Sequence, residues 1–319
     1  MSLDISIAVI TKSNPQKLAR CLQSIGGQTV KPYAIIVIDN DKNKSALPIV
    51  KLVQKYFPPV VYIHEPNTTV PGARNRAIAE CESSIIGFTD DDCVLSPSWI
   101  QEALTSLNNK GVSYVIGRSL LLNHENTVAR AFQTRYAYWL AYELKKHGGL
   151  PSPFLMDTKN VAYKKNVLIN NRVAFDTKLQ ISGHDSADTD VGFQLASKKI
   201  LGIYNPQMII QHEETPTVPL LIKKAYFRGM LAMQLTKKWS LKGEFVHLPD
   251  RRIFYFLRRT KYWLSEFHPI LKDVNLIFWK KIVVFFLIRL HEFIYLRGFL
   301  RQATTLDVDI DRYSAKTDK

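Results

Sequence analysis

The sequence predicts an α/β protein: a doubly wound, mostly parallel sheet flanked by helices, with a C-terminal helical extension. Three observations support this prediction. Apolar runs typical of buried strands alternate with helical segments between residues 5 and 107. The 319 residues, 46% hydrophobic and 22% charged, suffice for a large core and exclude a disordered chain. Basic and aromatic residues interleave from Pro216 onward, which predicts the helical extension.

The first half of the α/β pattern is regular. Residues 5–11 form a continuous apolar run, which predicts a buried strand. Asn14-Pro15 predicts the start of a helix, and Gly26-Gly27 predicts its end. Further strands are predicted at 33–38, 60–63 and 85–88, with helices over 46–56 and 72–76 between them.

The second half is less regular. Ser96 and Pro97 predict a helix with serine as its N-cap and proline in its first position, running to Leu107. The remaining expected elements are a strand at 114–117, an aromatic-rich helix at 128–144, a helix through Leu195, and strand residues at 203–204 and 208–210.

The cysteines Cys21, Cys81 and Cys93 are scattered and lack any CxxC spacing. This pattern favours buried thiols in a reducing compartment over a disulfide framework or structural zinc. The first residues lack the basic segment of a signal peptide, and the late apolar run Ile282–Ile288 is too short to cross a bilayer. We therefore expect a cytoplasmic protein without a transmembrane anchor.

Three consecutive carboxylates, Asp90 to Asp92, follow the strand predicted at 85–88. Like charges this close raise one another's pKa, so the run is costly beside a buried sheet unless a cation offsets it. Oxygen ligands favour Mg²⁺ or Mn²⁺ bound together with substrate phosphates. The alternative interpretation is a solvated acidic turn.

Polar side chains also end the first two strands, at Thr11 and Asp39. Because doubly wound sheets bind ligands beyond the carboxyl ends of their strands, we expect these residues and the acidic triplet to share one crevice. No glycine-rich dinucleotide motif or P-loop is found. Phosphate would then be held by metal and basic side chains, with Lys12, Arg74 and Arg76 nearest in sequence, although most helical arginines are ordinary surface residues.

A second acidic cluster, residues 183–193, contains Asp185, Asp188 and Asp190 and opens the helix that runs through Leu195. Interaction with the helix dipole is the alternative to a catalytic role for such residues. His212 follows the last predicted strand, where a single histidine usually has no special role.

Together these segments resemble the family 2 glycosyltransferases, inverting enzymes with the GT-A nucleotide-sugar-binding fold. The resemblance extends from about Ile5 to Glu214 and depends on the order and spacing of its elements, none of which is specific alone. The elements are Thr11 with Asn14, Asp39, Pro71-Gly72-Ala73-Arg74-Asn75, the block from Phe88 to Pro97, Asn160-Val161-Ala162, Asp188-Thr189-Asp190, and Pro206 followed by His212.

The resemblance implies a role for each matched residue. Asp39 would hydrogen-bond the nucleobase of a nucleotide-sugar donor, with Thr11 beside that base. Asp90 and Asp92 would be the two acids of the D-x-D motif: Asp90 would face the ribose or sugar, and Asp92 would bind the divalent ion. Asp91, between these two acids, is also expected to bind the nucleotide-sugar donor.

The remaining matches concern the pocket and the base. Arg74 and Asn160 would line the donor or acceptor pocket, and His212 would be a further contact to the metal or diphosphate. Asp188 matches the general base. Asp190 and Asp185 stay alternatives, because the chain departs from the pattern there: Ala187 stands where Glu is frequent, and Gln194 where Arg is frequent. A separate departure concerns the nucleobase and ribose contacts, since residues 39–42 read Asp-Asn-Asp-Lys instead of the common Asp-Asp-Gly-Ser.

The implied reaction moves a sugar from a nucleotide-sugar to a hydroxyl of a saccharide or lipid-linked acceptor, in cell-surface polysaccharide or glycolipid synthesis. The chemistry asks for both acidic clusters. Displacing a nucleoside diphosphate builds negative charge that a metal ion can neutralise. The attacking hydroxyl needs a carboxylate to take its proton.

The formal net charge of +15 is concentrated late in the chain, since residues 216–301 contain 17 Lys and Arg but 5 Asp and Glu. Basic helices with aromatic faces can lie in an anionic membrane interface, which would attach the protein peripherally to the cytoplasmic leaflet. The alternative is a helical subdomain that packs on the sheet or on a second subunit. We expect a catalytic domain at 1–215, this helical region at 216–302, and a disordered polar tail at 303–319.

Nucleic-acid binding is the rival class, because basic and aromatic residues also suit stacking on single strands. No RNA-binding motif is present and the basic excess lies away from the acidic clusters, so no nucleic-acid partner is expected. A nucleotidyltransferase of related fold would need a basic glycine-rich loop after the first strand, which is absent. A non-catalytic nucleotide-sugar-binding protein stays an alternative.

Overall fold

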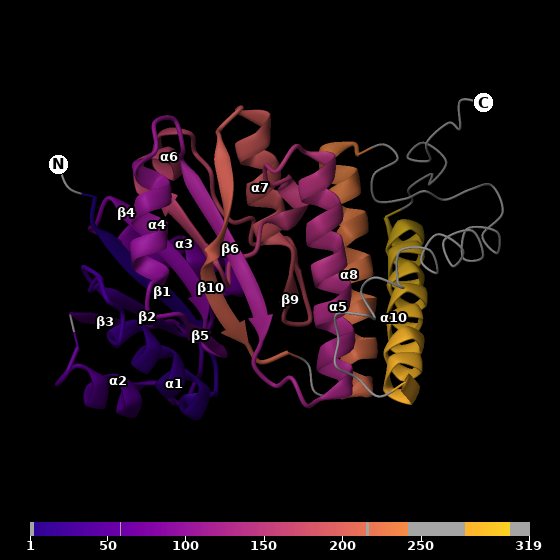
Figure 1. Ribbon diagram of the computed structural model, residues 1–319, viewed down its shortest axis with the longest axis horizontal. Coiled ribbons are helices and arrows are strands. Elements are labelled where there is room, and N and C mark those ends of the chain that lie inside the picture. The colour runs from indigo at the N-terminus through magenta and orange to yellow at the C-terminus, as the bar shows by residue number, and fades with distance from the viewer. Residues whose placement is uncertain (1–2, 58, 215–216, 242–277, 307–319) are drawn as a thin grey trace. The chain divides into compact units, whose positions relative to one another are not determined.

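A computed structural model describes residues 3–57, 59–214, 217–241 and 278–306 (Figure 1). Their contacts divide them into two units. The sheet unit comprises residues up to 122, 140–183 and 187–213, and the helical unit comprises 123–139, 184–186 and the described residues from 214 onward. Residues 123–139 and 184–186 thus group with the C-terminal helices, although the sequence assigns them to the first domain.

The sheet unit is built on an eight-stranded sheet with the order β3-β2-β1-β4-β7-β6-β10-β5 (Figure 1). Strands β1 to β4 pair in parallel, as do β6 and β10, whereas β7 and β5 pair antiparallel with their neighbours. The predicted mostly parallel sheet is confirmed. The strand bounds are β1 Ile5–Thr11, β2 Ile35–Asp39, β3 Val60–His64, β4 Ile85–Asp90, β5 Cys93–Leu95, β6 Tyr114–Leu121, β7 Val161–Lys164 and β10 Gly202–His212.

Helices of this unit follow the predicted alternation. Helix α1 begins at Pro15 and is capped at Gly27, as the sequence predicts. The other elements are α2 Leu47–Val53, α3 Val70–Glu80, α4 Trp99–Asn108, the 3-10 helix η1 Pro153–Leu155, α6 Lys165–Asn170, the short strand β8 Gln180–Ile181 and α7 Ala187–Ser197.

The start predicted for α4 is wrong by two residues. The helix begins at Trp99 rather than Pro97, because neighbouring segments hold the backbone before it. The Ser96 amide donates to the Ile209 carbonyl, and the Pro97 carbonyl accepts from the Thr29 amide. Trp99 is thereby inserted, fully buried, into the core.

The main core lies between the sheet and its covering helices. Its strand residues include Ile7, Val9, Ile35 and Val37, all without exposed surface. Strands that are buried on both faces explain why their sequences are continuous apolar runs rather than alternating ones. The polar side chains that these strands offer to a ligand therefore lie at the strand ends, where the apolar runs stop.

The helical unit contains the first part of α5 Thr127–Lys146, together with β9 His184–Asp185, α8 Val218–Trp239 and α10 Phe278–Thr305. Helices α8 and α10 approach closely through glycines. A Cβ at Gly229 would lie 1.9 Å from the Tyr295 carbonyl oxygen, and one at Gly298 would lie 2.0 Å from that of Tyr226. Within the described residues, no helix is both long and apolar enough to cross a membrane.

Part of the predicted tail is helical instead of disordered. Helix α10 continues to Thr305, because Gln302 and Ala303 are buried and extend the packed face of the helix. The rest of the predicted tail, 307–319, lies outside the described residues, as does the basic aromatic segment 242–277.

Candidate active site

The carboxyl ends of β1, β2 and β4 lie side by side in the sheet. In the parallel register, Thr11 is opposite Asp39 and Ile10 is opposite Asp90. The Thr11 hydroxyl donates a hydrogen bond to Asp91 Oδ2 over 2.6 Å. The fold thus brings Thr11, Asp39 and the acidic triplet to one edge, as expected for neighbouring strand ends.

The ionised form of the acidic triplet is disfavoured by burial and by repulsion among its carboxylates. Asp91 is 8% exposed. Burial, reinforced by Asp92 and Asp90, raises its pKa to about 7 against the hydrogen bond from Thr11. Burial and the charge of Asp92 also raise the pKa of Asp90, although nearby basic side chains oppose the shift. A bound cation would relieve this repulsion.

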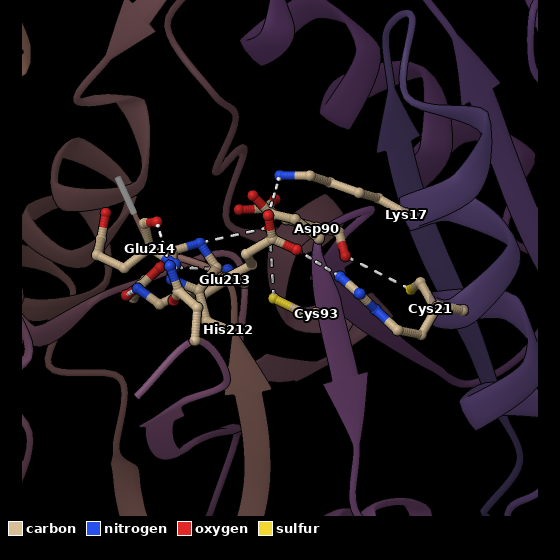
Figure 2. A network of polar contacts seen from close by, with 12 residues as sticks. Lys17, Cys21, Asp90, Cys93, His212, Glu213 and Glu214 are labelled. Carbon is tan, nitrogen blue, oxygen red and sulfur yellow. Dashed lines mark hydrogen bonds and ion pairs between the residues drawn. The ribbon is translucent and has the colours of Figure 1, made fainter. Parts of the chain in front are cut away.

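Three potential metal ligands meet where β10 pairs with β5. The antiparallel register sets His212 opposite Cys93 (Figure 2). His212 Nε2 lies 3.3 Å from Asp92 Oδ1. The Cys93 thiol donates to the same carboxylate oxygen over 3.8 Å. One ligand atom from each of the three residues lies within 4.8 Å of the others.

These residues fit a divalent ion. Asp92 supplies a carboxylate oxygen and His212 an imidazole nitrogen, which are ordinary ligands of Mn²⁺ and related metals. Burial, with added repulsion from Asp90 and Asp92, raises the pKa of the Cys93 thiol well above its usual value, so the thiol stays a hydrogen-bond donor. The sequence had not indicated Cys93, because it becomes a neighbour of His212 only through strand pairing.

Glu213 anchors the end of β10 beside His212. Its carboxylate lies 3.1 Å from Lys17 Nζ (Figure 2). It also lies 2.7 Å from Nη2 of Arg20, which is on α1 like Lys17. Burial alone would raise the pKa of Glu213, but the hydrogen bonds from Arg20 and Lys17 outweigh it and lower the pKa. The Glu213 amide also donates to the Asp92 carbonyl over 3.1 Å. Sequence reasoning missed this anchor because Arg20 and Glu213 are 193 residues apart.

The Asp39 carboxylate is fully buried and accepts hydrogen bonds from its own chain. The donors are the amides of Asp41 and Ala46, at 2.9 and 3.2 Å, and the Tyr62 hydroxyl, at 2.8 Å. In this arrangement Asp39 shapes the turn that follows β2. Its contact with a nucleobase stays a prediction.

Asn160 is 2% exposed and uses both ends of its amide inside the protein. Its oxygen accepts from Trp99 Nε1 over 2.7 Å, and its nitrogen donates to the Arg118 and Met208 carbonyls over 3.0 and 3.1 Å. These bonds join α4, β6 and β10. The predicted contact of Asn160 with donor or acceptor is not visible in these partners and stays a prediction.

Arg74 lies on α3 near the acidic triplet. It is 6% exposed, and its guanidinium lies 5.5 Å from the centre of the Phe175 ring. Asn75 holds Phe175 there, since its amide group and the backbone of Phe175 exchange hydrogen bonds of 2.8 and 2.9 Å. The positive charge of Arg74 opposes the rise in the pKa of Asp90, so the two side chains interact electrostatically.

The first turn of α7 separates two of the candidate bases. Asp190 has no exposed surface and accepts a hydrogen bond from Gln194 Nε2 over 2.8 Å. Asp188 is partly exposed, and its Oδ1 accepts from the Thr189 amide over 2.6 Å. Gln194 also donates to the Ala174 carbonyl, so it joins Asp190 to a neighbouring loop.

Comparison with known proteins decides the family. The model of glycosyl transferase family 2 matches residues 6–171, which is more than half of the chain. The chain belongs to this family. It is 31% identical over 120 residues to the succinoglycan biosynthesis protein ExoM of Rhizobium meliloti, covering 36% of this chain and 38% of that one. It is 34% identical over 100 residues to the uncharacterized glycosyltransferase YwdF of Bacillus subtilis, covering 31% and 37%. The chain thus spans well under half the length of these two curated relatives.

Solved structures establish the GT-A fold of this family 2 chain. The mannosyltransferase PcManGT of Pyrobaculum calidifontis, in complex with GDP-Man and Mn²⁺, superposes with a TM-score of 0.57 at 14% identity, covering 96% of this chain and 76% of that one. TarS 1-349 of S. aureus in complex with UDP-GlcNAc superposes with a TM-score of 0.53 at 11% identity, covering 96% and 93%. At these identities the likeness concerns the fold alone.

Proposed function

We propose that this chain is an inverting, metal-dependent glycosyltransferase that moves a sugar from a nucleotide-sugar to an acceptor hydroxyl. The observation that carries the proposal is the group formed by Asp92 and His212 at the sheet edge that also holds Thr11 and Asp90. Membership of the family and the buried surplus of negative charge at this edge support it.

Asp92 and His212 would hold the ion, with Mn²⁺ or Mg²⁺ as the expected metals. When bound, the ion would stabilise the charge of the departing nucleoside diphosphate. Glu213, tied to α1, keeps His212 in position for this task. A nucleoside diphosphate-sugar is the expected donor, because similar folds are known with GDP-Man and with UDP-GlcNAc. Thr11 and Asp39 lie at the same edge of the sheet, where we expect the nucleoside of the donor to bind.

Asp188 is proposed to take the proton of the acceptor hydroxyl. A general base must reach its substrate, and Asp188 is partly exposed whereas Asp190 has no exposed surface and is held by Gln194. Attack from the face opposite the leaving group then inverts the anomeric carbon. Asp190 would instead fix the first turn of α7.

A saccharide or lipid-linked acceptor in cell-surface polysaccharide or glycolipid synthesis is proposed, in line with the biosynthetic role in the name of ExoM. Attachment to the cytoplasmic face of an anionic membrane is part of this proposal. Phe278, Phe286 and Phe293 share one side of α10 and are each more than half exposed. Lys280 and Lys281 follow Phe278 and Trp279 directly, as suits a helix in an anionic interface.

The first experiment is a thermal-shift measurement with UDP, GDP, dTDP, CMP and their sugars, each with Mn²⁺ and with EDTA. A ligand at a hundredfold excess over its Kd stabilises the folded state by about 2.7 kcal/mol, which is readily measured. We expect one nucleoside diphosphate-sugar to stabilise the protein in Mn²⁺ and not in EDTA, and Asp92→Asn to abolish the shift. Absence of a shift with every nucleotide would overturn the proposal.

A second measurement separates an enzyme from a binding protein. Release of nucleoside diphosphate from the stabilising donor is followed with the unchanged protein and with Asp188→Asn. We expect Asp188→Asn to bind the donor normally but to lose turnover. Equal release by both proteins would reject Asp188 as the base, and normal binding without any release or transfer in either would favour the non-catalytic alternative.

A further inference from the structure

We infer that the helical unit binds a phosphate or diphosphate group, through Lys224 and Arg228 of α8 and the buried His291 of α10. These side chains share one neighbour, the ring of Phe132 on α5. The inference deepens the proposed function, on which it rests, by assigning a phosphate-bearing acceptor to the enzyme.

Two cations are gathered on the Phe132 ring. Lys224 Nζ lies 5.0 Å and the Arg228 guanidinium 6.0 Å from the centre of this ring. The two residues are one helical turn apart on α8, so they project from the same face of the helix. Phe132 itself is 5% exposed, so both cations contact a ring that is fixed in the protein interior.

The positive charge here exceeds the nearby negative charge. Lys224 pairs with Glu214 over 2.5 Å, whereas Arg228 is exposed and forms no hydrogen bond or ion pair with any residue that the structure describes. Arg135 adds a third cation, since its charge also acts on His291. An aromatic ring attracts cations without neutralising them, so the side chains of this cluster that the structure describes keep a net positive charge.

His291 provides an independent sign of a missing ligand. It is 2% exposed, and neither of its ring nitrogens has a hydrogen-bond partner among the described residues. Its ring contacts the Phe132 ring edge-on, with 5.4 Å between centres. Burial, followed by the charges of Arg135, Arg228 and Lys224, lowers the pKa of His291 well below its usual value, so the ring is neutral and keeps one N–H donor. A buried polar group without a partner is costly unless a ligand or water satisfies it.

A second imidazole responds to the same cations. His184 stacks on Phe227 with 5.4 Å between ring centres. Burial, followed by the charges of Arg228, Lys224 and Lys223, lowers the pKa of His184 to about 4. Among the residues that the structure describes, the negative charge of Glu214 partly offsets the lowering of the His291 pKa, and that of Asp185 partly offsets the lowering of the His184 pKa.

The donor set matches a phosphate better than a carboxylate. Arg228 offers a planar fork, Lys224 a compact ammonium and His291 a neutral N–H donor, which together suit an anion with several acceptor oxygens. Leu220 lies one helical turn before Lys224 on the same face of α8, and it is 47% exposed. A phosphate that carries a hydrocarbon chain would contact both kinds of surface. The shared chemistry is a phosphate group, either lipid-linked or free.

The test uses the full chain in EDTA, so that metal at the sheet edge does not capture the probe. Binding of pyrophosphate and of farnesyl diphosphate is measured by titration calorimetry. Arg228→Gln removes one charge from the cluster, and the matched control Lys237→Gln removes one charge from the exposed end of the same helix. We expect both probes to bind saturably, with Arg228→Gln weakening them about tenfold or more, as for loss of a charge-assisted hydrogen bond.

His291→Phe keeps an aromatic ring at the buried position. We expect it to weaken pyrophosphate binding while the thermal midpoint without ligand is unchanged or raised, because an unsatisfied polar group is removed. Tighter binding of farnesyl diphosphate than of pyrophosphate would indicate a lipid-linked source, and equal binding a free phosphate. No saturable binding, or equal losses in Arg228→Gln and Lys237→Gln, would overturn the site. The donor-induced thermal shift in Mn²⁺ should persist in all three variants, which separates failure of this site from failure of the proposed function.

Discussion

Replacing Asn160 with alanine distinguishes a structural role from a role in the donor or acceptor pocket. The amide accepts one hydrogen bond from Trp99 and donates two, to the carbonyls of Arg118 and Met208. Asn160→Ala removes all three bonds together. If the side chain mainly joins α4, β6 and β10, the loss should appear as reduced stability.

The size of the loss follows from what the partners can do afterwards. Trp99 and Met208 have no exposed surface, so water cannot replace their bonds to Asn160, whereas Arg118 is exposed. Each buried group left without a partner costs about 1–3 kcal/mol. We therefore expect the free energy of unfolding to fall by about 4 kcal/mol. For a domain of this size, that loss lowers the midpoint temperature by roughly 8–16 °C.

Thermal and urea denaturation of Asn160→Ala measure this loss, with the exposed Asn170→Ala as the matched control. The control should unfold within about 0.5 kcal/mol of the unchanged protein. Donor affinity, measured below the unfolding transition, should stay within a few-fold. The reasoning is refuted if Asn160→Ala unfolds like the control yet binds the nucleotide-sugar about tenfold more weakly, because the side chain would then contact the donor.

The other predictions concern the base, the metal site, the helix contact and pH. Asp188→Asn should lower turnover about a hundredfold or more in a nucleoside diphosphate release assay, with the donor Kd unchanged; a change in Kd alone would argue against a base. Glu213→Gln should raise the Mn²⁺ concentration for half-maximal activity about tenfold, because the link from Lys17 and Arg20 to the strand that carries His212 is weakened; an unchanged Mn²⁺ titration would contradict this. Gly298→Ala should destabilise the protein by about 1–3 kcal/mol in thermal unfolding, since the added Cβ would lie 2.0 Å from the Tyr226 carbonyl oxygen. Asp91 has a folded-state pKa of about 7 against an ordinary value of 3.8. The protonated Asp91 carboxyl therefore contributes fully to the free energy of unfolding below about pH 4, and this contribution is lost as the pH rises through about 7. In EDTA, Asp91→Asn should therefore be the more stable protein at pH 8, by at most about 4 kcal/mol; parallel stability curves at pH 4 to 8 would disprove the shift.

Local patterns carried most of the prediction of the fold. The apolar run 5–11 and the Asn14-Pro15 signal gave β1 and the start of α1 correctly, because both depend on residues close in sequence. The start of α4 was wrong, since a cap signal at Ser96 competes with backbone hydrogen bonds to Thr29 and Ile209. The prediction of a disordered tail was wrong for residues 303–305 for a similar reason. These residues are mostly polar, but the helix continues through them because Ala303 is buried in the helical unit.

The candidate site divides in the same way. The acidic triplet and Thr11 could be assigned to one edge from the sequence, because parallel strands end on the same side of a sheet. Cys93 and Glu213 could not, because their partners are His212 across a strand pair and the basic side chains of α1. Nor does spacing reveal that the Asp39 carboxylate is occupied by hydrogen bonds from its own chain.

The sequence by itself determined the class of sheet, the family resemblance and the acidic strand end, because hydrophobic periodicity and short motifs act over a few residues. Only the tertiary structure decided which side chains meet. It joined Asp92 to His212, buried Asp190 while leaving Asp188 partly exposed, and gathered Lys224 and Arg228 on Phe132. Burial and electrostatic contact arise when distant segments pack together, and they set which carboxylates and cations are available for chemistry.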